Sequence, residues 1–184
     1  MGLSEEPEGP TTLVNYEVIA RMVAVASEAP AGCFVEVGVY KGGTAWFLSR
    51  LAKLQGRELY LYDTFTGIPY SGKNDPHKVG DFSDTSIEEV SKHVPDAHII
   101  QGIFPSTAVD MGAVGFVHLD VDQEQSYTDA LEYLLPLMSP GGVIWCDDAD
   151  CLPGASDAVC EFALKYQHKV QVCRDLKIYL KIGG

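Results

Sequence analysis

VEVGVYKGGTA, residues 35–45, reads as a strand, a glycine-containing turn and the start of a helix. Such a turn lets backbone N–H groups approach a ligand beside the positive end of a helix. The turn is not G-x-G-x-x-G, because Val39 and Tyr40 follow Gly38 without a second glycine in place. It is not a phosphate-binding G-x-x-x-x-G-K-[ST] loop either, because Thr44 stands where that loop has its lysine. A tight turn that needs glycine for steric reasons alone is the alternative.

Strand and helix signals alternate along the chain on both sides of this turn. Apolar residues at helical spacing predict helices over residues 13–28, 43–54, 87–93, 126–138 and 155–166, and the second of these places Ala45, Leu48, Leu51 and Leu54 on one face. Short apolar runs predict strands over residues 33–38, 58–63, 97–101, 115–121 and 142–146. This alternation predicts an α/β fold with a doubly wound parallel sheet. Residues 169–173 and 176–182 predict a closing antiparallel hairpin.

Two aspartate clusters each close an apolar strand. They are FVHLDVD, residues 116–122, and GVIWCDD, residues 142–148. The carboxyl ends of parallel strands form one ligand-binding edge, so both clusters should meet there. Gathered carboxylates repel one another unless a cation or shared protons neutralise them. Ligand sets made of oxygen alone suit a hard ion, so the pattern predicts a Mg²⁺ site.

Asp63 ends the second predicted strand and opens a long polar loop that runs to Asp84. An acidic side chain at this position can accept hydrogen bonds from both hydroxyls of a ribose. The glycine turn together with Asp63 therefore predicts an adenosine-type ligand.

Composition indicates one enzyme-sized domain. The chain has 184 residues and 46% apolar content, and we expect residues 13–184 to form a single domain after a flexible acidic lead over residues 1–12. A net charge of −13 argues against nucleic-acid and membrane partners. Five cysteines without a C-x-x-C pair read as reduced thiols, and the amino terminus has no signal-peptide pattern, so we expect a cytoplasmic protein.

Six motifs occur in a fixed order along the chain. They are EVGVYKGGT (36–44), YDTFTGIP (62–69), GDFS (80–83), GIFP (102–105), HLDVD (118–122), and SPGGVI (139–144) followed by Asp147 and Asp148. Together they resemble the macrocin O-methyltransferase family, whose members use S-adenosylmethionine and a metal to methylate sugar hydroxyls of natural products. The resemblance covers approximately residues 14–162.

This resemblance implies a fold, two cofactors and a set of site residues. The fold is that of class I methyltransferases, a Rossmann-like three-layer sandwich with a seven-stranded, mostly parallel sheet. Mg²⁺ is implied at Asp120, Asp147 and Asp148, and Asp122 is the candidate catalytic base for a small-molecule hydroxyl acceptor. The residues implied for binding S-adenosylmethionine are Glu36, Gly38, Tyr40, Gly42, Thr44, Asp63, Thr64, Phe65, Ser83, Gly102, Phe104 and Asp120.

The chain departs from the family pattern in two places. Gln123 and Glu124 replace a Leu-Tyr pair after Asp122, which alters the wall beside the base. The segment before the glycine turn is short, which implies either a larger or more exposed acceptor or a lid lent by a second subunit of a homo-oligomer. Residues 70–80 are the best remaining lid candidate within the chain. His118, inside an apolar strand, is interpreted as a structural histidine; His77, in the polar loop, either approaches substrate or is solvated.

Two functions of other classes remain as alternatives. A D-x-D pair followed later by Asp147 and Asp148 superficially resembles a phosphohydrolase of the haloacid-dehalogenase type. That class places its D-x-D on the first strand, whereas Asp120 and Asp122 lie in the middle of this chain. A non-catalytic module that binds S-adenosylmethionine is the second alternative, and it has no need of four clustered acids.

Overall fold

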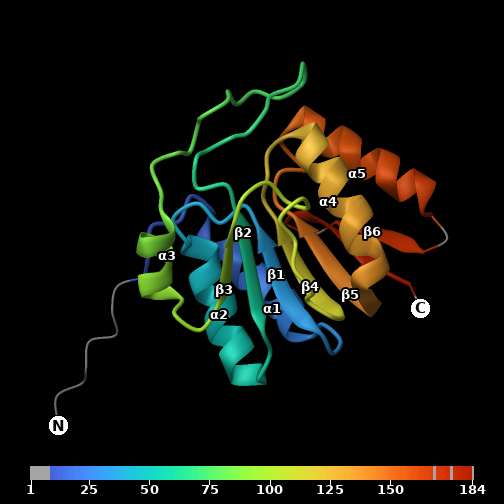
Figure 1. Cartoon of the computed structure of the whole chain (residues 1–184). Coiled ribbons are helices and arrows are strands. Elements are labelled where there is room, and N and C mark those ends of the chain that lie inside the picture. The colour runs from blue at the N-terminus through green and yellow to red at the C-terminus, as the bar shows by residue number, and fades with distance from the viewer. Residues whose placement is uncertain (1–8, 168, 175, 184) are drawn as a thin grey trace, which may run out of the picture.

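Seven strands form one sheet in the computed structural model, which describes residues 9–167, 169–174 and 176–183 (Figure 1). The strand order is β3-β2-β1-β4-β5-β7-β6, and only β7 runs antiparallel to the other six strands. The strands are β1 (Cys33–Val37), β2 (Leu59–Asp63), β3 (His98–Gln101), β4 (Val114–Leu119), β5 (Met138–Cys146), β6 (Val170–Arg174) and β7 (Ile178–Ile182). The predicted alternation of strands and helices and the antiparallel closing hairpin are therefore confirmed.

Helices cover both faces of the sheet and make three layers. The helices are α1 (Tyr16–Ser27), α2 (Gly43–Gln55), α3 (Ile87–His93), α4 (Glu124–Leu134) and α5 (Pro153–Lys165). Apolar residues of α1, α2 and α3 share one core cluster with Phe34 and Phe116 of the sheet. Those of α4 and α5 share another with Val35 and Val117, the next residues along the same strands. Because successive side chains of a strand point to opposite faces, the two cores lie on opposite sides of the sheet.

The end of α4 differs from the prediction of a helix through residue 138. The α-helix ends at Leu134, a 3₁₀ turn (Leu135–Leu137) follows, and β5 begins at Met138. Pro136 lacks a backbone N–H and its ring disfavours a continued α-helix, which explains the early end. Met138 then pairs with Val114 at the start of β4.

Leu54 was expected on the buried face of α2 but is 83% exposed. A series spaced by three residues drifts around a helix that has 3.6 residues per turn. Ala52 takes the buried position instead, beside Ala45 and Leu48.

The expected flexible lead is only partly described. Residues 1–8 lie outside the described residues, whereas residues 9–12 lie against the protein. Thr12 packs so closely on Gly43 that a Cβ there would overlap it. Within the described ranges, no helix combines the length and the apolar composition that crossing a membrane requires.

Candidate active site

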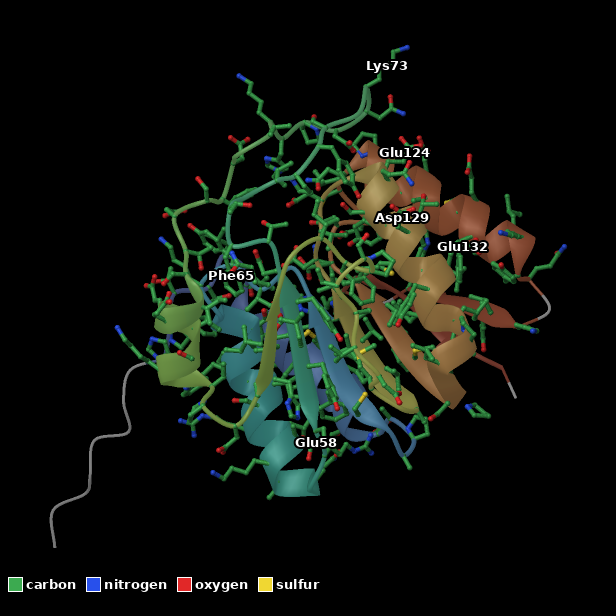
Figure 2. All side chains as sticks on the ribbon, viewed as in Figure 1. Glu58, Phe65, Lys73, Glu124, Asp129 and Glu132 are labelled. Atoms are coloured by element: carbon green, nitrogen blue, oxygen red, sulfur yellow. The ribbon has the colours of Figure 1, made fainter. Side chains whose placement is uncertain are left out.

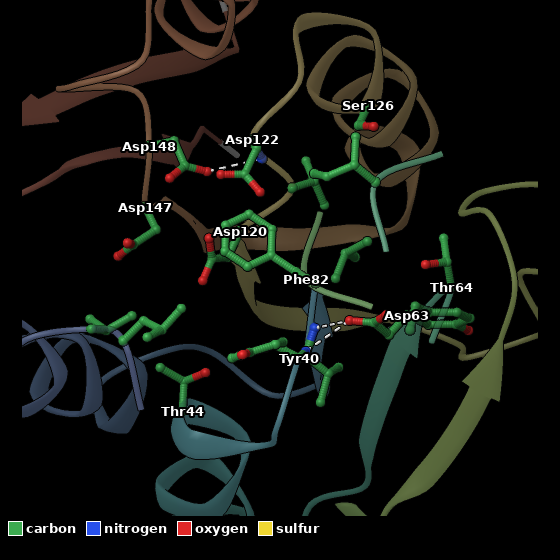
Figure 3. Close-up of a pocket in the computed structure, with 18 of the residues that line it drawn as sticks. Tyr40, Thr44, Asp63, Thr64, Phe82, Asp120, Asp122, Ser126, Asp147 and Asp148 are labelled. Carbon is green, nitrogen blue, oxygen red and sulfur yellow. Dashed lines mark hydrogen bonds between the residues drawn. The ribbon is translucent and has the colours of Figure 1, made fainter. Parts of the chain in front are cut away.

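A cavity of about 400 Å³ opens at the carboxyl ends of β1, β2, β4 and β5 (Figure 3). The segment between β2 and α3 rises above this end of the sheet (Figure 1), with Lys73 at its outer tip (Figure 2). Most of the predicted site residues line the cavity, namely Gly38, Tyr40, Thr44, Asp63, Thr64, Gly102, Phe104, Asp120, Asp122, Asp147 and Asp148. Glu36, Gly42, Phe65 and Ser83 are not among the lining residues. The structure therefore brings the glycine turn and both aspartate clusters to one cavity.

The glycine turn packs directly against the first aspartate cluster. Gly38 has a φ of +87°, and a Cβ at this position would overlap the carbonyl oxygen of Asp120. Only glycine satisfies both the positive φ and this close approach. The glycine turn and Asp120, which follows β4, are thus in van der Waals contact.

The Asp63 carboxylate fixes this turn by accepting hydrogen bonds from the backbone of the turn. Its Oδ2 accepts hydrogen bonds from the N–H groups of Val39 at 2.7 Å and Tyr40 at 2.8 Å, and its Oδ1 accepts one from Phe65 at 2.7 Å. A carboxylate has about four acceptor positions, so one remains for a ligand hydroxyl. The prediction that Asp63 binds a ribose stays a prediction, and the structure adds a bracing role.

Asp120, Asp147 and Asp148 each offer one oxygen within 4.8 Å of the others. Burial, together with the charges of Asp148 and Asp147, raises the pKa of Asp120 well above its ordinary value. Burial and the charges of Asp122 and Asp147 raise the pKa of Asp148 to about 7. These raised pKa values show a negative cluster that lacks sufficient positive charge, and a donor set made of carboxylate oxygens fits a hard divalent cation.

Asp147 differs from its two neighbours. Burial would raise its pKa, but His118 and then the Lys177 ammonium lower it below the ordinary value. Lys177 donates to the Asp147 carbonyl oxygen at 2.7 Å and lies 3.7 Å from its Oδ2. Asp147 is therefore the member of the cluster that stays ionised most readily.

Asp122 lies beside the cluster in a left-handed backbone conformation, with a φ of +58°. Its N–H donates to Oδ2 of Asp148 at 3.1 Å, and Nε2 of His77 lies 3.5 Å from its Oδ1. Burial and the charge of Asp147 raise the pKa of Asp122 to about 6. A carboxylate with this pKa in a cavity is suited to accept a proton near neutral pH.

Glu36, predicted to contact the cofactor, lies beneath the cavity. Its side chain is fully buried and its Oε1 contacts Thr44 and His118. On a strand buried on both faces, residue alternation does not reveal whether a polar side chain faces ligand or core.

Several lining residues were missed by sequence analysis. They are Lys177, on the turn between β6 and β7, Phe82, whose ring packs against Tyr40, and the segment from Thr11 to Asn15. Phe82 lies in the GDFS motif but was not singled out, whereas Lys177 and residues 11–15 belong to none of the six motifs. The positions of Lys177 and residues 11–15 beside the cavity depend on tertiary contacts, so no local signal could have identified them.

Stability of the metal-free protein is expected to fall as pH rises from about 4 to about 7.5. The pKa of Asp122 is about 6 and that of Asp148 about 7. A carboxyl whose pKa is raised in the folded state stabilises the fold below its unfolded pKa, and this stabilisation is lost as pH rises through the folded pKa. For a protein of this size, a change of one kcal/mol in the free energy of unfolding changes Tm by about 2–4 °C. We therefore expect Tm to fall by at least about 5 °C over this pH range.

Thermal unfolding in excess chelator at pH 5 and pH 7.5 measures this effect. Added Mg²⁺ should raise Tm more at pH 7.5, where the carboxyls are ionised. The double variant Asp122→Asn, Asp148→Asn should flatten the dependence, which separates these two groups from the net charge of the chain. A wild-type Tm that rises across this pH range would contradict the expectation.

The chain resembles known proteins over most of its length. A family model described as Macrocin-O-methyltransferase (TylF) matches residues 9–177. The chain is 27% identical over 162 residues to the 8-demethyl-8-(2,3-dimethoxy-alpha-L-rhamnosyl)-tetracenomycin-C 4'-O-methyltransferase of Streptomyces olivaceus, covering 77% of this chain and 62% of that protein. It is 27% identical over 157 residues to the demethyldecarbamoylnovobiocin O-methyltransferase of Streptomyces niveus, covering 73% and 59%. The chain thus spans about three fifths of the length of these relatives.

Solved structures resemble this fold closely. The O-methyltransferase NovP matches with a TM-score of 0.77 and 24% identity, over 91% of this chain and 79% of that one. The calicheamicin methyltransferase CalS11 matches with a TM-score of 0.69 and 19% identity, over 91% and 78%. These likenesses confirm the expected class I methyltransferase fold.

Proposed function

Because the chain belongs to the macrocin O-methyltransferase family, we propose that it is an S-adenosylmethionine-dependent, Mg²⁺-dependent O-methyltransferase. We propose that the acceptor is a small molecule, a natural product methylated at a sugar hydroxyl. We also propose that the protein acts in the cytoplasm. The name of one relative, which describes methylation of a rhamnosyl-bearing tetracenomycin, supports a sugar acceptor.

One observation carries this proposal: the glycine turn and the acidic cluster line the same cavity, with Gly38 in contact with Asp120. A methyl transfer needs the donor and the acceptor hydroxyl within a few ångströms of each other. A turn suited to an adenosine-type ligand beside carboxylates suited to a cation meets this need. A bare cofactor-binding module requires only the first of these features.

The residues of the chain divide the work as follows. Asp120, Asp147 and Asp148 would hold a divalent ion, which would act as a Lewis acid that lowers the pKa of the acceptor hydroxyl. Bound S-adenosylmethionine would supply the electrophilic methyl group, and its sulfur would keep the electrons of the broken sulfur–methyl bond. Asp122 would accept the proton of the acceptor hydroxyl at a carboxylate oxygen, which would make the hydroxyl oxygen nucleophilic toward the methyl group. The Asp63 carboxylate holds the turn of Val39 and Tyr40 at the donor side of the cavity.

A phosphohydrolase is less consistent with this geometry. In the haloacid-dehalogenase type the nucleophilic aspartate follows the first strand, whereas Asp120 follows β4. Asp120 is also held with Asp147 and Asp148 in the three-carboxylate cluster beside the glycine turn. This placement is better suited to holding a cation than to attacking a phosphoryl group.

Isothermal titration with S-adenosylmethionine tests the proposal, and Asp63→Ala should weaken binding about 10–150-fold. This range corresponds to losing one charge-assisted hydrogen bond of about 1.5–3 kcal/mol. The brace on Val39 and Tyr40 is lost as well, so Tm should also fall. Asp96→Ala, at an exposed aspartate that pairs with Lys53 at 3.0 Å, is the matched control. If the wild type does not bind S-adenosylmethionine, the proposed function is wrong; if Asp63→Ala binds it normally, only the role of Asp63 is.

A further inference from the structure

Four polar side chains form a row along one side of the cavity, one from α2 and three from the neighbouring strands β1, β4 and β5 or the residue after them. Thr44 lies at the start of α2, Glu36 in β1, His118 in β4, and Asp147 directly after β5. Thr44 and Asp147 are 5% and 8% exposed, and both line the cavity. Glu36 and His118 are fully buried between them. Through the protein interior, the row therefore joins the part of the cavity beside the glycine turn, where we place the methyl donor, to the acidic cluster.

Two contacts of the row converge on one oxygen of Glu36. The Thr44 hydroxyl donates to Oε1 of Glu36, and Nδ1 of His118 lies 2.7 Å from the same oxygen. Glu36 and His118 are direct partners in the pairing of β1 with β4, so the backbone register holds the two side chains together. The other ring nitrogen of His118, Nε2, faces Oδ1 of Asp147 at 3.8 Å.

The last step of the row is not closed. Among the described residues, His118 Nε2 and Asp147 Oδ1 are both buried without a hydrogen-bond partner. Buried polar atoms are almost always paired in native proteins. A movement of about 1 Å by the Asp147 carboxylate would bring the two atoms to hydrogen-bond distance. The histidine ring is fixed by Glu36 and by burial, so the carboxylate is the partner free to move.

We propose that Glu36 and His118 are positioning residues that orient the Asp147 carboxylate for its metal ion, and that Glu36 does not contact the cofactor. The inference rests on the proposed function, in which Asp147 is a metal ligand. Asp147 follows the end of its strand, where its side chain has more rotational freedom than inside the sheet. A ring anchored by a buried carboxylate removes this freedom from one oxygen and leaves the other, Oδ2, for the ion.

The expected effect of losing this support is a loss of metal affinity. Groups that hold a metal ligand from behind typically contribute 10–100-fold in metal affinity. Glu36→Gln keeps the size of the side chain and an oxygen for Thr44 but removes the charge that anchors His118. We expect Mn²⁺ or Mg²⁺ to bind this variant about 10–100-fold more weakly in isothermal titration, with unchanged affinity for S-adenosylmethionine.

Two other patterns would overturn the proposal. If Glu36 touches the cofactor, Glu36→Gln loses affinity for S-adenosylmethionine and keeps its metal affinity. If Glu36 serves the fold alone, both affinities stay at wild-type values and only Tm falls.

A pair of substitutions at His118 tests the second half of the row. The amide of His118→Asn reaches the position of Nδ1 and retains the contact with Glu36, but nothing then faces Asp147. The amide of His118→Gln reaches the position of Nε2 instead. We expect the asparagine variant to lose metal affinity and the glutamine variant to keep more of it. Equal metal affinity in the two variants contradicts the proposal, and this pair decides the matter if Glu36→Gln does not fold.

The chain offers a matched control for these variants. His98 Nε2 and Glu58 Oε2 form a second histidine–glutamate pair, also at 2.7 Å, but both side chains are exposed. Glu58 lies at the end of the sheet away from the cavity (Figure 2). Glu58→Gln should leave metal and cofactor affinities unchanged. The wild-type titrations distinguish failure of the proposed function from failure of this inference. A wild type that binds neither ligand refutes the proposed function. Variants that bind metal as the wild type does refute only this inference.

Discussion

Asp122→Asn is expected to lower methyl-transfer turnover by about 10²–10⁴-fold at neutral pH, the usual contribution of a general base. The asparagine side chain keeps the size of aspartate but does not accept the proton of the acceptor hydroxyl. Asparagine also tolerates the left-handed conformation found at this position, where φ is +58°. The backbone N–H that donates to Asp148 at 3.1 Å is unaffected. Affinities for metal and for S-adenosylmethionine should therefore stay near their wild-type values.

The pH profile gives a second readout of the same assignment. The pKa of Asp122 is raised to about 6 without metal, and a nearby cation lowers it. The base works when it is deprotonated, so wild-type turnover should rise with pH through a midpoint at or below about 6. In Asp122→Asn this acid limb should disappear.

Asp129→Asn is a suitable control, because Asp129 lies on the outer surface of α4 (Figure 2). If Asp122→Asn instead loses metal and recovers its rate at saturating Mg²⁺, Asp122 is a ligand and the base lies elsewhere. His77, whose Nε2 lies 3.5 Å from Asp122, is then the next candidate.

The sequence was sufficient to predict where the chemistry gathers. Strands alternating with helices imply a parallel sheet, and a parallel sheet brings residues that follow its strands to one edge. Asp63, Asp120 and Asp147 each follow or end a strand, and all three line the cavity. No knowledge of side-chain packing was needed for this step.

The directions in which side chains point and the groups that they contact could not be predicted in the same way. Glu36 belongs to a strand that is buried along its whole length, so alternation does not show where its carboxylate points. Asp63 was predicted to bind a ligand hydroxyl, but its backbone partners were not predicted: Oδ2 accepts the N–H groups of Val39 and Tyr40, and Oδ1 accepts that of Phe65. Lys177 reaches Asp147 from a hairpin 30 residues later. Contacts of this kind depend on three-dimensional packing and leave no local pattern in the sequence.

Removal of divalent metal is expected to abolish methyl transfer while leaving the binding of S-adenosylmethionine largely intact. A metal that polarises the reacting oxygen contributes several kcal/mol to the transition state, so turnover should fall by at least about 10³-fold. The donor side of the cavity depends on the glycine turn and on Asp63, whose three backbone contacts do not involve the cluster. Cofactor titration in excess chelator should therefore give an affinity near that measured with Mg²⁺.

Asp148→Asn is the substitution that matches metal removal, because it takes one charge from the cluster and keeps the local contacts. The amide oxygen can still accept from the Asp122 N–H and lie near the Tyr127 hydroxyl, which is 3.2 Å from Oδ2 of Asp148 in the wild type. One negative charge is lost from the cluster, so metal should bind more weakly and a higher Mg²⁺ concentration should be needed for half-maximal turnover. Burial and the charges of Asp122 and Asp147 raise the pKa of Asp148 to about 7 without metal, so protons compete with the ion there. Lowering pH from 7.5 to 6 should accordingly raise the Mg²⁺ requirement of the wild type more than that of the variant. Full turnover in excess chelator would mean that the three carboxylates do not bind a metal. The acidic cluster would then need another positive group to neutralise it. Among the described residues, the nearest cation is Lys177, whose Nζ lies 3.7 Å from Oδ2 of Asp147.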